Sequence, residues 1–169
     1  MASDPTVSVT RGYLPGAIGR VTELHGSYYA DHWGFGLFFE AKVASELSTF
    51  LRAYDADRDA LWLATVAGRI EGAIAIDGTH AAESGAHLRW FILSDGLRGN
   101  GMGRQLINRA VDFCVKKAYR RIFLWTFEGL DAARHLYESV GFSLACQQKG
   151  AGWGTEVNEQ MFECKPLDQ

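Results

Sequence analysis

The fold is decided by residues 87–117, which read HLRWFILSDGLRGNGMGRQLINRAVDFCVKK. From His87 to Leu93 the side chains alternate between two faces, which predicts a long strand. From Gly103 to Lys117 apolar residues recur on one helical face, and charged residues take the other face. Between them, Arg98–Gly103 holds three glycines in six residues. The stretch therefore predicts a strand, a glycine-rich turn and a helix in immediate succession.

The side chains of this strand and this helix can be assigned to faces. Strict alternation along the strand puts Leu88, Trp90 and Ile92 on one face. It puts Arg89, Phe91 and Leu93 on the other face. The helix is expected to bury the stripe formed by Leu106, Ile107, Ala110, Val111, Cys114 and Val115.

The turn before the helix has the chemistry of an anion site. Backbone N–H groups at a helix N-terminus lack intrahelical partners, and the helix dipole adds about half a positive charge there. Glycines let the backbone approach a bound phosphate closely. Arg98 and Arg104 bracket the turn and add cationic donors, which favours a diphosphate. The alternative is that the glycines only shape a tight loop, as short glycine patterns often do.

Two well-known phosphate loops do not fit this turn. The P-loop pattern fails because no Lys-Ser or Lys-Thr pair follows the glycines. The dinucleotide fingerprint fits Gly99 and Gly101, but its third glycine would fall at Arg104.

The rest of the chain supplies further strands and helices. Two apolar runs separated by Ala67, Gly68 and Arg69 predict an antiparallel hairpin. The continuous apolar run 122–125 predicts a strand that is covered on both faces. Helices are expected at residues 16–30, 37–51 and 131–140, and strands at 7–9, 61–66, 70–77, 122–125, 142–147 and 155–164.

Composition excludes several classes of protein. With 169 residues, 47% apolar and 22% charged, the chain suits one compact domain spanning 1–169. A formal net charge of -3 gives no overall positive field for a nucleic acid. The three cysteines form no disulfide framework, and the histidines form no zinc motif, so no metal is expected. Since no apolar run reaches membrane-spanning length and no leader is evident, a cytoplasmic protein without a membrane partner is predicted.

Two motifs resemble a known family. Arg98, Gly101 and Gly103 match the R/Q-x-x-G-x-G/A loop of the GNAT superfamily of N-acetyltransferases. Residues 133–142 are similar to its A-x-x-L-Y-x-x-x-G-F segment. The resemblance implies an α/β (α+β) fold, with a mixed, mostly antiparallel sheet of six to seven strands and helices on both faces. The pieces around His25, Tyr28 and Phe39 resemble the acetyltransferase half of bacterial fusions with MarR-type regulators.

The resemblance also implies an activity, in which an acetyl group passes from acetyl-CoA to a primary amine that attacks the thioester directly. Tyr137 takes the place of the general acid that protonates the leaving thiolate. The alternative for Tyr137 is simple core packing. By the resemblance, the cofactor is held by the backbone of Phe91, Ile92 and Leu93 and by the loop residues Arg98, Gly99, Asn100, Gly101, Met102, Gly103 and Arg104.

The sequence departs from the family pattern at two places. Trp125 stands where many members carry a glutamate base, and Leu130 stands where many use an asparagine on the cofactor. The sequence therefore does not identify the general base that deprotonates the amine. Its candidates are Glu23, His25, Glu40 and Glu83, each of which also suits a surface or local hydrogen-bonding role.

The acceptor is predicted less sharply than the cofactor. A small primary amine is favoured, and a protein substrate or a coenzyme A sensor with little turnover are the alternatives. Exposed sheet ends leave room for a homodimer. By the resemblance, the acceptor site is walled by an aromatic group that could equally serve core packing, formed by Tyr28, Tyr29, His32, Trp33, Phe35, Phe38 and Phe39.

Overall fold

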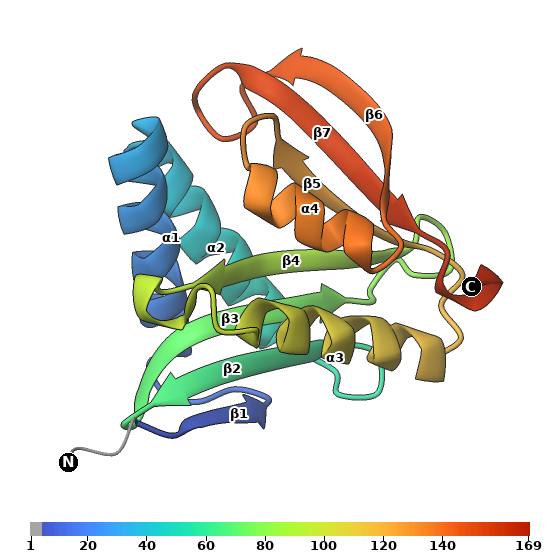
Figure 1. The fold of residues 1–169 in the computed structure, drawn as a ribbon, viewed down its shortest axis with the longest axis horizontal. Coiled ribbons are helices and arrows are strands. Elements are labelled where there is room, and N and C mark those ends of the chain that lie inside the picture. Colours follow the sequence, from blue (N-terminus) through green and yellow to red (C-terminus); the bar gives the residue numbers. More distant parts are fainter. Residues whose placement is uncertain (1–4) are drawn as a thin grey trace.

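The computed structural model of the chain describes residues 5–169. Seven strands form one sheet in the order β1-β2-β3-β4-β5-β7-β6 (Figure 1). The strands are β1 (Val7–Arg11), β2 (Ala60–Val66), β3 (Arg69–Asp77), β4 (Ala86–Leu93), β5 (Ile122–Phe127), β6 (Ser143–Gly150) and β7 (Val157–Cys164). The helices are α1 (Ala17–Trp33), α2 (Leu37–Arg52), α3 (Met102–Lys116) and α4 (Asp131–Ser139), with short 3-10 turns η1 (Asp95–Leu97) and η2 (Pro166–Asp168).

Two neighbouring strands, β4 and β5, diverge from each other at the centre of the sheet. Neighbouring strands are antiparallel except β4 and β5, which are parallel. In the described chain these two strands pair only at Ala86 with Ile122 and at His87 with Phe123, and then separate. The backbone edge of β4 beyond His87 is therefore left without a strand partner on the β5 side. This topology confirms the predicted mixed, mostly antiparallel sheet.

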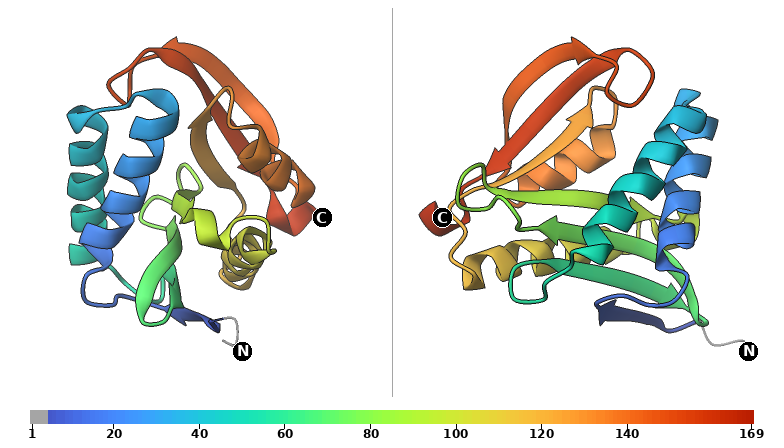
Figure 2. Two further views of the ribbon diagram at one scale, coloured as in Figure 1. Left: turned by 60° about the vertical axis from the view of Figure 1, so that its left-hand side comes forward. Right: turned by 180° about the vertical axis from the view of Figure 1, so that it is seen from behind.

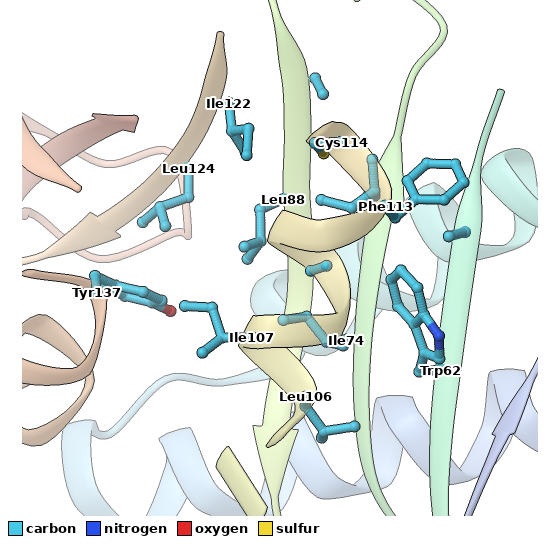
Figure 3. Close-up of a cluster of buried hydrophobic side chains, with 14 of the residues drawn as sticks. Trp62, Ile74, Leu88, Leu106, Ile107, Phe113, Cys114, Ile122, Leu124 and Tyr137 are labelled. Atoms are coloured by element: carbon cyan, nitrogen blue, oxygen red, sulfur yellow. The ribbon is translucent and has the colours of Figure 1, made fainter. Parts of the chain in front are cut away.

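Helices cover both faces of the sheet, as expected. Helices α1 and α2 lie on one face, and α3 and α4 lie on the other (Figure 2). On the α3 face, Leu106 and Ile107 pack with Trp62, Ile74 and Leu88 (Figure 3). On the opposite face, α1 and α2 cover the half of the sheet that contains β2, β3 and β4. Among residues 5–169, the helices include none long and apolar enough to cross a bilayer.

Strand β4 contains a bulge that the alternation pattern missed. Trp90 has a positive φ of 49°, and the register with β3 shifts between Ala73 and Ala75. Because an extra residue moves the following side chains to the other face, Leu88 joins the α3 core while Trp90 and Ile92 join the α1/α2 core. The prediction that all three share one face was therefore wrong.

Two further expectations about burial were wrong. The run 122–125 is not covered on both faces, since Trp125 is 36% exposed. The reason is that α1 packs on β5 only at its end, at Phe127, while Trp125 lines a cavity. In α3, Val115 is 43% exposed, whereas Phe113 is buried in the same turn of the helix. The apolar stripe thus curves away from Val115 at the end of the helix.

Candidate active site

A cavity of about 1280 Å³ lies where β4 and β5 diverge. One end is formed by the glycine-rich turn before α3, including Arg98, Gly101 and Arg104. The other end lies between α2 and the β7 strand, where it is lined by Glu46 and Glu159. The divergence of two parallel strands therefore connects the two faces of the sheet through one cavity.

The turn at the first end presents unpaired amides. Gly101 is the N-cap of α3, with φ 86° and ψ 0°, a left-handed conformation that suits glycine. Within the described chain, the N–H groups of Gly101, Gly103 and Arg104 have no hydrogen-bond acceptor. The Oδ1 atom of Asn100 accepts a hydrogen bond of 3.2 Å from the Met102 amide. A methyl group added at Gly101 would meet no atom within 4 Å, so the space beside this residue is open.

The two arginines that flank the turn behave differently. Arg98 donates from Nε and Nη2 to the Leu93 carbonyl, at 3.1 and 3.0 Å. Its guanidinium also lies 4.0 Å from the centre of the Tyr28 ring, which joins the turn to α1. Arg104 is exposed and forms no hydrogen bond or ion pair with residues 5–169. Arg98 thus supports the turn, and Arg104 stays available to an anion.

The predicted cofactor residues are largely brought together. Phe91, Ile92 and Leu93 line the cavity, as do the turn residues except two. Asn100 and Met102 do not line it, because the Asn100 side chain caps the turn and the Met102 side chain is buried in the α3 core. Any contact of these two residues with a ligand would come from their backbone.

Tyr137 on α4 lies in the middle of the cavity wall. Its ring is buried against Phe91, Phe142 and Phe162, with 7% of the residue exposed. The hydroxyl points away from α4 (Figure 3), and it has no hydrogen-bond partner among the described residues. Burial, with a smaller effect from Tyr29, raises the pKa of Tyr137 well above the usual value of a phenol. Core packing and a free hydroxyl therefore coexist at this residue.

Four charged residues that the sequence did not single out line the other end of the cavity. Glu46 on α2 accepts a hydrogen bond from Lys42 at 2.6 Å and a second from Arg89 on β4. On β7, Glu159 accepts a hydrogen bond of 2.9 Å from the Gly152 amide. The groove between α2 and β7 is therefore polar on both sides.

The predicted aromatic group in residues 28–39 divides into three sets. Tyr28, Tyr29, His32, Trp33 and Phe39 line the cavity. Phe35 is buried in the α1/α2 core, and Phe38 is 60% exposed outside it. Gly129 and Gly154 have no room for a Cβ atom, because the rings of Trp33 and Phe38 lie against them. Trp33 therefore joins the end of α1 to the loop between β5 and α4 at the cavity, whereas Phe38 joins α2 to the loop between β6 and β7 outside it.

Comparison with known proteins identifies the family to which this chain belongs. The model of the acetyltransferase (GNAT) family matches residues 20–142. The chain belongs to this family. The expected GNAT membership is therefore confirmed, while the finer resemblance to the MarR-type fusions stays a prediction.

Individual proteins that resemble this GNAT protein match it at low sequence identity or over part of their length. An N-acetylaspartate synthetase of Xenopus tropicalis is 31% identical over 81 residues, which cover 48% of this chain and 30% of that protein. The chain spans about half the length, or less, of the curated relatives it matches. A Staphylococcus aureus acetyltransferase of the GNAT family superposes with a TM-score of 0.77 at 16% identity, covering 95% of this chain and 99% of that one. A Salmonella typhimurium protein, solved with its cofactor acetyl-CoA, gives a TM-score of 0.72 at 14% identity and covers 94% of each chain. These structural matches show the shared fold.

The two departures from the GNAT pattern both lie on the cavity wall. Trp125 and Leu130 line it, as does the buried Thr126, which follows Trp125 in β5. Trp125 provides an apolar surface where a carboxylate would otherwise stand. Within residues 5–169, no group of three or more His, Cys, Asp or Glu side chains is placed to hold a metal ion.

Of the four candidate bases in this GNAT protein, the structure brings one to the cavity. Glu23 pairs with Arg20 at 2.8 Å on the surface, and Glu40 and Glu83 are exposed away from the cavity. His25 lines the cavity and is buried. Its Nδ1–H donates to the Val21 carbonyl at 2.8 Å, which leaves Nε2 as the unprotonated nitrogen. Burial lowers the pKa of His25 to about 4, so the ring is neutral at pH 7.

The lowered pKa of His25 predicts a pH-dependent stability. The folded state disfavours the protonated ring. The contribution of neutral His25 to the free energy of unfolding is therefore complete above pH 6.5, and it is lost as the pH falls from 6.5 towards 4. Relative to His25→Asn, which keeps a donor for the Val21 carbonyl, the wild type should lose up to about 3 kcal/mol of unfolding free energy over that range.

Urea unfolding at a series of pH values measures this difference. The matched control is His80→Asn, at an exposed histidine in the loop between β3 and β4, whose stability should follow the wild type. A constant difference between wild type and His25→Asn from pH 7 to pH 4 would show that the buried ring is not held neutral.

Proposed function

We propose that this GNAT protein is an acetyl-CoA-dependent N-acetyltransferase that acetylates a primary amine of a small molecule. The observation that carries the proposal is that one cavity contains both the free amides at the start of α3 and the free hydroxyl of Tyr137. The first suits a diphosphate, and the second suits a proton donor at a leaving thiolate. The turn residues and Tyr137 both line the cavity at the place where β4 and β5 diverge.

The residues of the turn fit the diphosphate part of acetyl-CoA. The N–H groups of Gly101, Gly103 and Arg104 would donate to its oxygens, and the exposed Arg104 guanidinium would add charge. The unpaired edge of β4 offers backbone groups to an extended chain, such as the pantetheine arm. When bound there, acetyl-CoA supplies an activated thioester. The name of the Salmonella relative, which was solved with acetyl-CoA, supports this choice of cofactor.

Tyr137 would hold the proton that the leaving sulfur needs. Its raised pKa keeps the hydroxyl protonated at neutral pH. A free phenol has a pKa of about 10 and a thiol about 8.5, so the two are close enough for proton transfer. Burial disfavours a thiolate for the same reason that it disfavours a phenolate, because each is a desolvated negative charge. A buried leaving thiolate would therefore be a stronger base than one in water, which offsets part of the raised pKa of Tyr137.

The acceptor would enter from the α2/β7 side of the sheet. An ammonium must lose its proton before it attacks, and His25 Nε2 is a neutral acceptor on the cavity wall. The cavity wall there includes Trp33, whose ring lies against Gly129, and Trp153. A small molecule fits a cavity walled by such large side chains more readily than a folded protein does, which favours the small amine.

The test is a screen for thiol release from acetyl-CoA over amino acids, polyamines and short peptides, with the acetylated product identified by mass spectrometry. The proposal expects one or more small amines to be acetylated. Acetylation of peptides alone would favour a protein substrate. Binding of acetyl-CoA without turnover over the whole panel would favour a sensor.

A further inference from the structure

The acceptor end of the cavity has an unequal distribution of charge. Its floor is the face of the sheet that α1 and α2 leave uncovered, where Trp125 is exposed. On the α2 side stand Lys42, Glu46 and Arg89, and on the β7 side stands Glu159. The two sides are separated by β5, because β4 and β7 are its neighbours in the sheet.

Glu46 does not neutralise both of its cationic partners. One carboxylate oxygen accepts from Lys42, and the other accepts from Arg89. One negative charge is thus shared by two positive charges, and the cluster keeps a net charge of about +1. Glu46 remains ionised in this setting, since Lys42 and Arg89 together lower its pKa despite partial burial.

The Arg89 side chain is fixed and still has free donors. Its guanidinium lies 4.2 Å from the centre of the Trp90 ring, and Nη2 donates to Glu46. Nε and Nη1 form no hydrogen bond with residues 5–169. The side chain is 22% exposed and lines the cavity, and neither nitrogen is both fully buried and unpaired, so these donors remain accessible to a ligand. A guanidinium held in this way loses little conformational freedom when it binds an anion.

These observations suit an anionic group on the acceptor. A planar guanidinium with free N–H groups matches a carboxylate, and the neighbouring ammonium of Lys42 adds to the field. A polyamine would instead bring further positive charge next to this cluster. Across β5, Glu159 has a carboxylate whose only hydrogen bond within the described chain is with the Gly152 amide. The groove therefore offers positive charge on one side and negative charge on the other.

Building on the proposed function, we propose that the acceptor is an amine that also carries a carboxylate, as an amino acid does. Arg89, assisted by Lys42, binds the carboxylate, and Glu159 attracts the ammonium from the opposite side of the groove. Arg89 thereby determines specificity and does not itself take part in the proton transfers.

Matched pairs of acceptors test this assignment. Free amino acids are compared with their α-amides in a thiol-release assay, since the amide keeps the amine and loses the negative charge. For the best amino acid, kcat/KM should exceed that of its amide by about 10- to 100-fold, as expected for a charge-assisted hydrogen bond. Arg89→Gln should remove most of this ratio by raising KM for the acid, while Arg89→Lys should restore part of it.

Controls separate this inference from the proposed function. Arg109→Gln, at an exposed residue of α3 outside the cavity, should leave the ratio unchanged. Calorimetry with acetyl-CoA verifies that each variant is folded and binds cofactor, and Lys42→Gln provides a second variant of the same cluster. If spermidine or amino-acid amides are acetylated as well as the free acids, or if Arg89→Gln affects both equally, the inference is overturned and the acetyltransferase proposal stands. If no amine is acetylated, the proposed function fails, and the inference fails with it.

Discussion

Tyr137→Phe should lower kcat by about 100-fold or more while leaving the affinity for acetyl-CoA within about twofold, since general acid catalysis is typically worth 10²- to 10⁴-fold. The substitution removes one hydroxyl that has no protein partner among the described residues. It keeps the ring that packs against Phe91, Phe142 and Phe162. The free energy of unfolding should therefore change little. Steady-state kinetics, calorimetry and urea unfolding measure the three quantities.

A second tyrosine provides the matched control for this experiment. The hydroxyl of Tyr119 donates to the Arg58 carbonyl at 2.7 Å, far from the cavity wall. Tyr119→Phe should lower stability by about 1 kcal/mol, the usual value of a lost hydrogen bond, and leave kcat unchanged. If Tyr137→Phe behaves like Tyr119→Phe, the hydroxyl of Tyr137 is not the proton donor.

Gly101→Val should weaken acetyl-CoA binding by about 100-fold. With φ 86° and ψ 0°, Gly101 has a conformation that a β-branched residue adopts only at a cost of about 1–3 kcal/mol. Relaxing that strain would turn the amides of Gly103 and Arg104 away from the cavity. The valine side chain would also occupy the open space beside Gly101, which lines the cavity. Calorimetry with acetyl-CoA measures the loss.

The chain contains a close match to Gly101 that isolates the effect on binding. Gly16 is the N-cap of α1, with φ 89° and ψ -5°, and a methyl group there would also meet no atom within 4 Å. Because Gly16 does not line the cavity, Gly16→Val introduces similar strain at a helix start without touching the candidate site. Equal losses of acetyl-CoA affinity in the two variants would mean that the turn before α3 has no special role.

The local features of the candidate site were predictable from the sequence. The strand, the glycine turn and the helix that follows are encoded by neighbouring residues, so α3 begins at Met102, within one residue of its expected start. The motif around Tyr137 is likewise contained in one short helix, α4. Such elements need no information from distant parts of the chain.

The features that depend on pairing between strands were not predictable in this way. The bulge at Trp90 exists because β4 has one residue more than β3 at that point, and alternation within a single strand does not show it. The exposure of Trp125 depends on where α1 and α2 end over the sheet. An apolar run alone cannot distinguish a covered strand from the floor of a groove.

The acceptor groove was missed for the same reason. Lys42, Glu46, Arg89 and Glu159 come from one helix and two strands that the fold brings to one cavity. Each is an ordinary charged residue in its own segment. The available signal was the position of Arg89 within an otherwise largely apolar strand, which suggests a partner for its charge. Identifying Glu46 as that partner required the tertiary structure.

The central claim is that amides freed at the start of α3 bind the diphosphate of acetyl-CoA. The most direct measurement is a titration of the ¹⁵N-labelled protein with acetyl-CoA, with S-acetylpantetheine, which lacks the diphosphate, as the comparison. We expect the amide resonances of Gly101, Gly103 and Arg104 to move furthest, towards the positions of hydrogen-bonded amides, and only with acetyl-CoA. Saturable binding of acetyl-CoA that leaves these three resonances in place would contradict it.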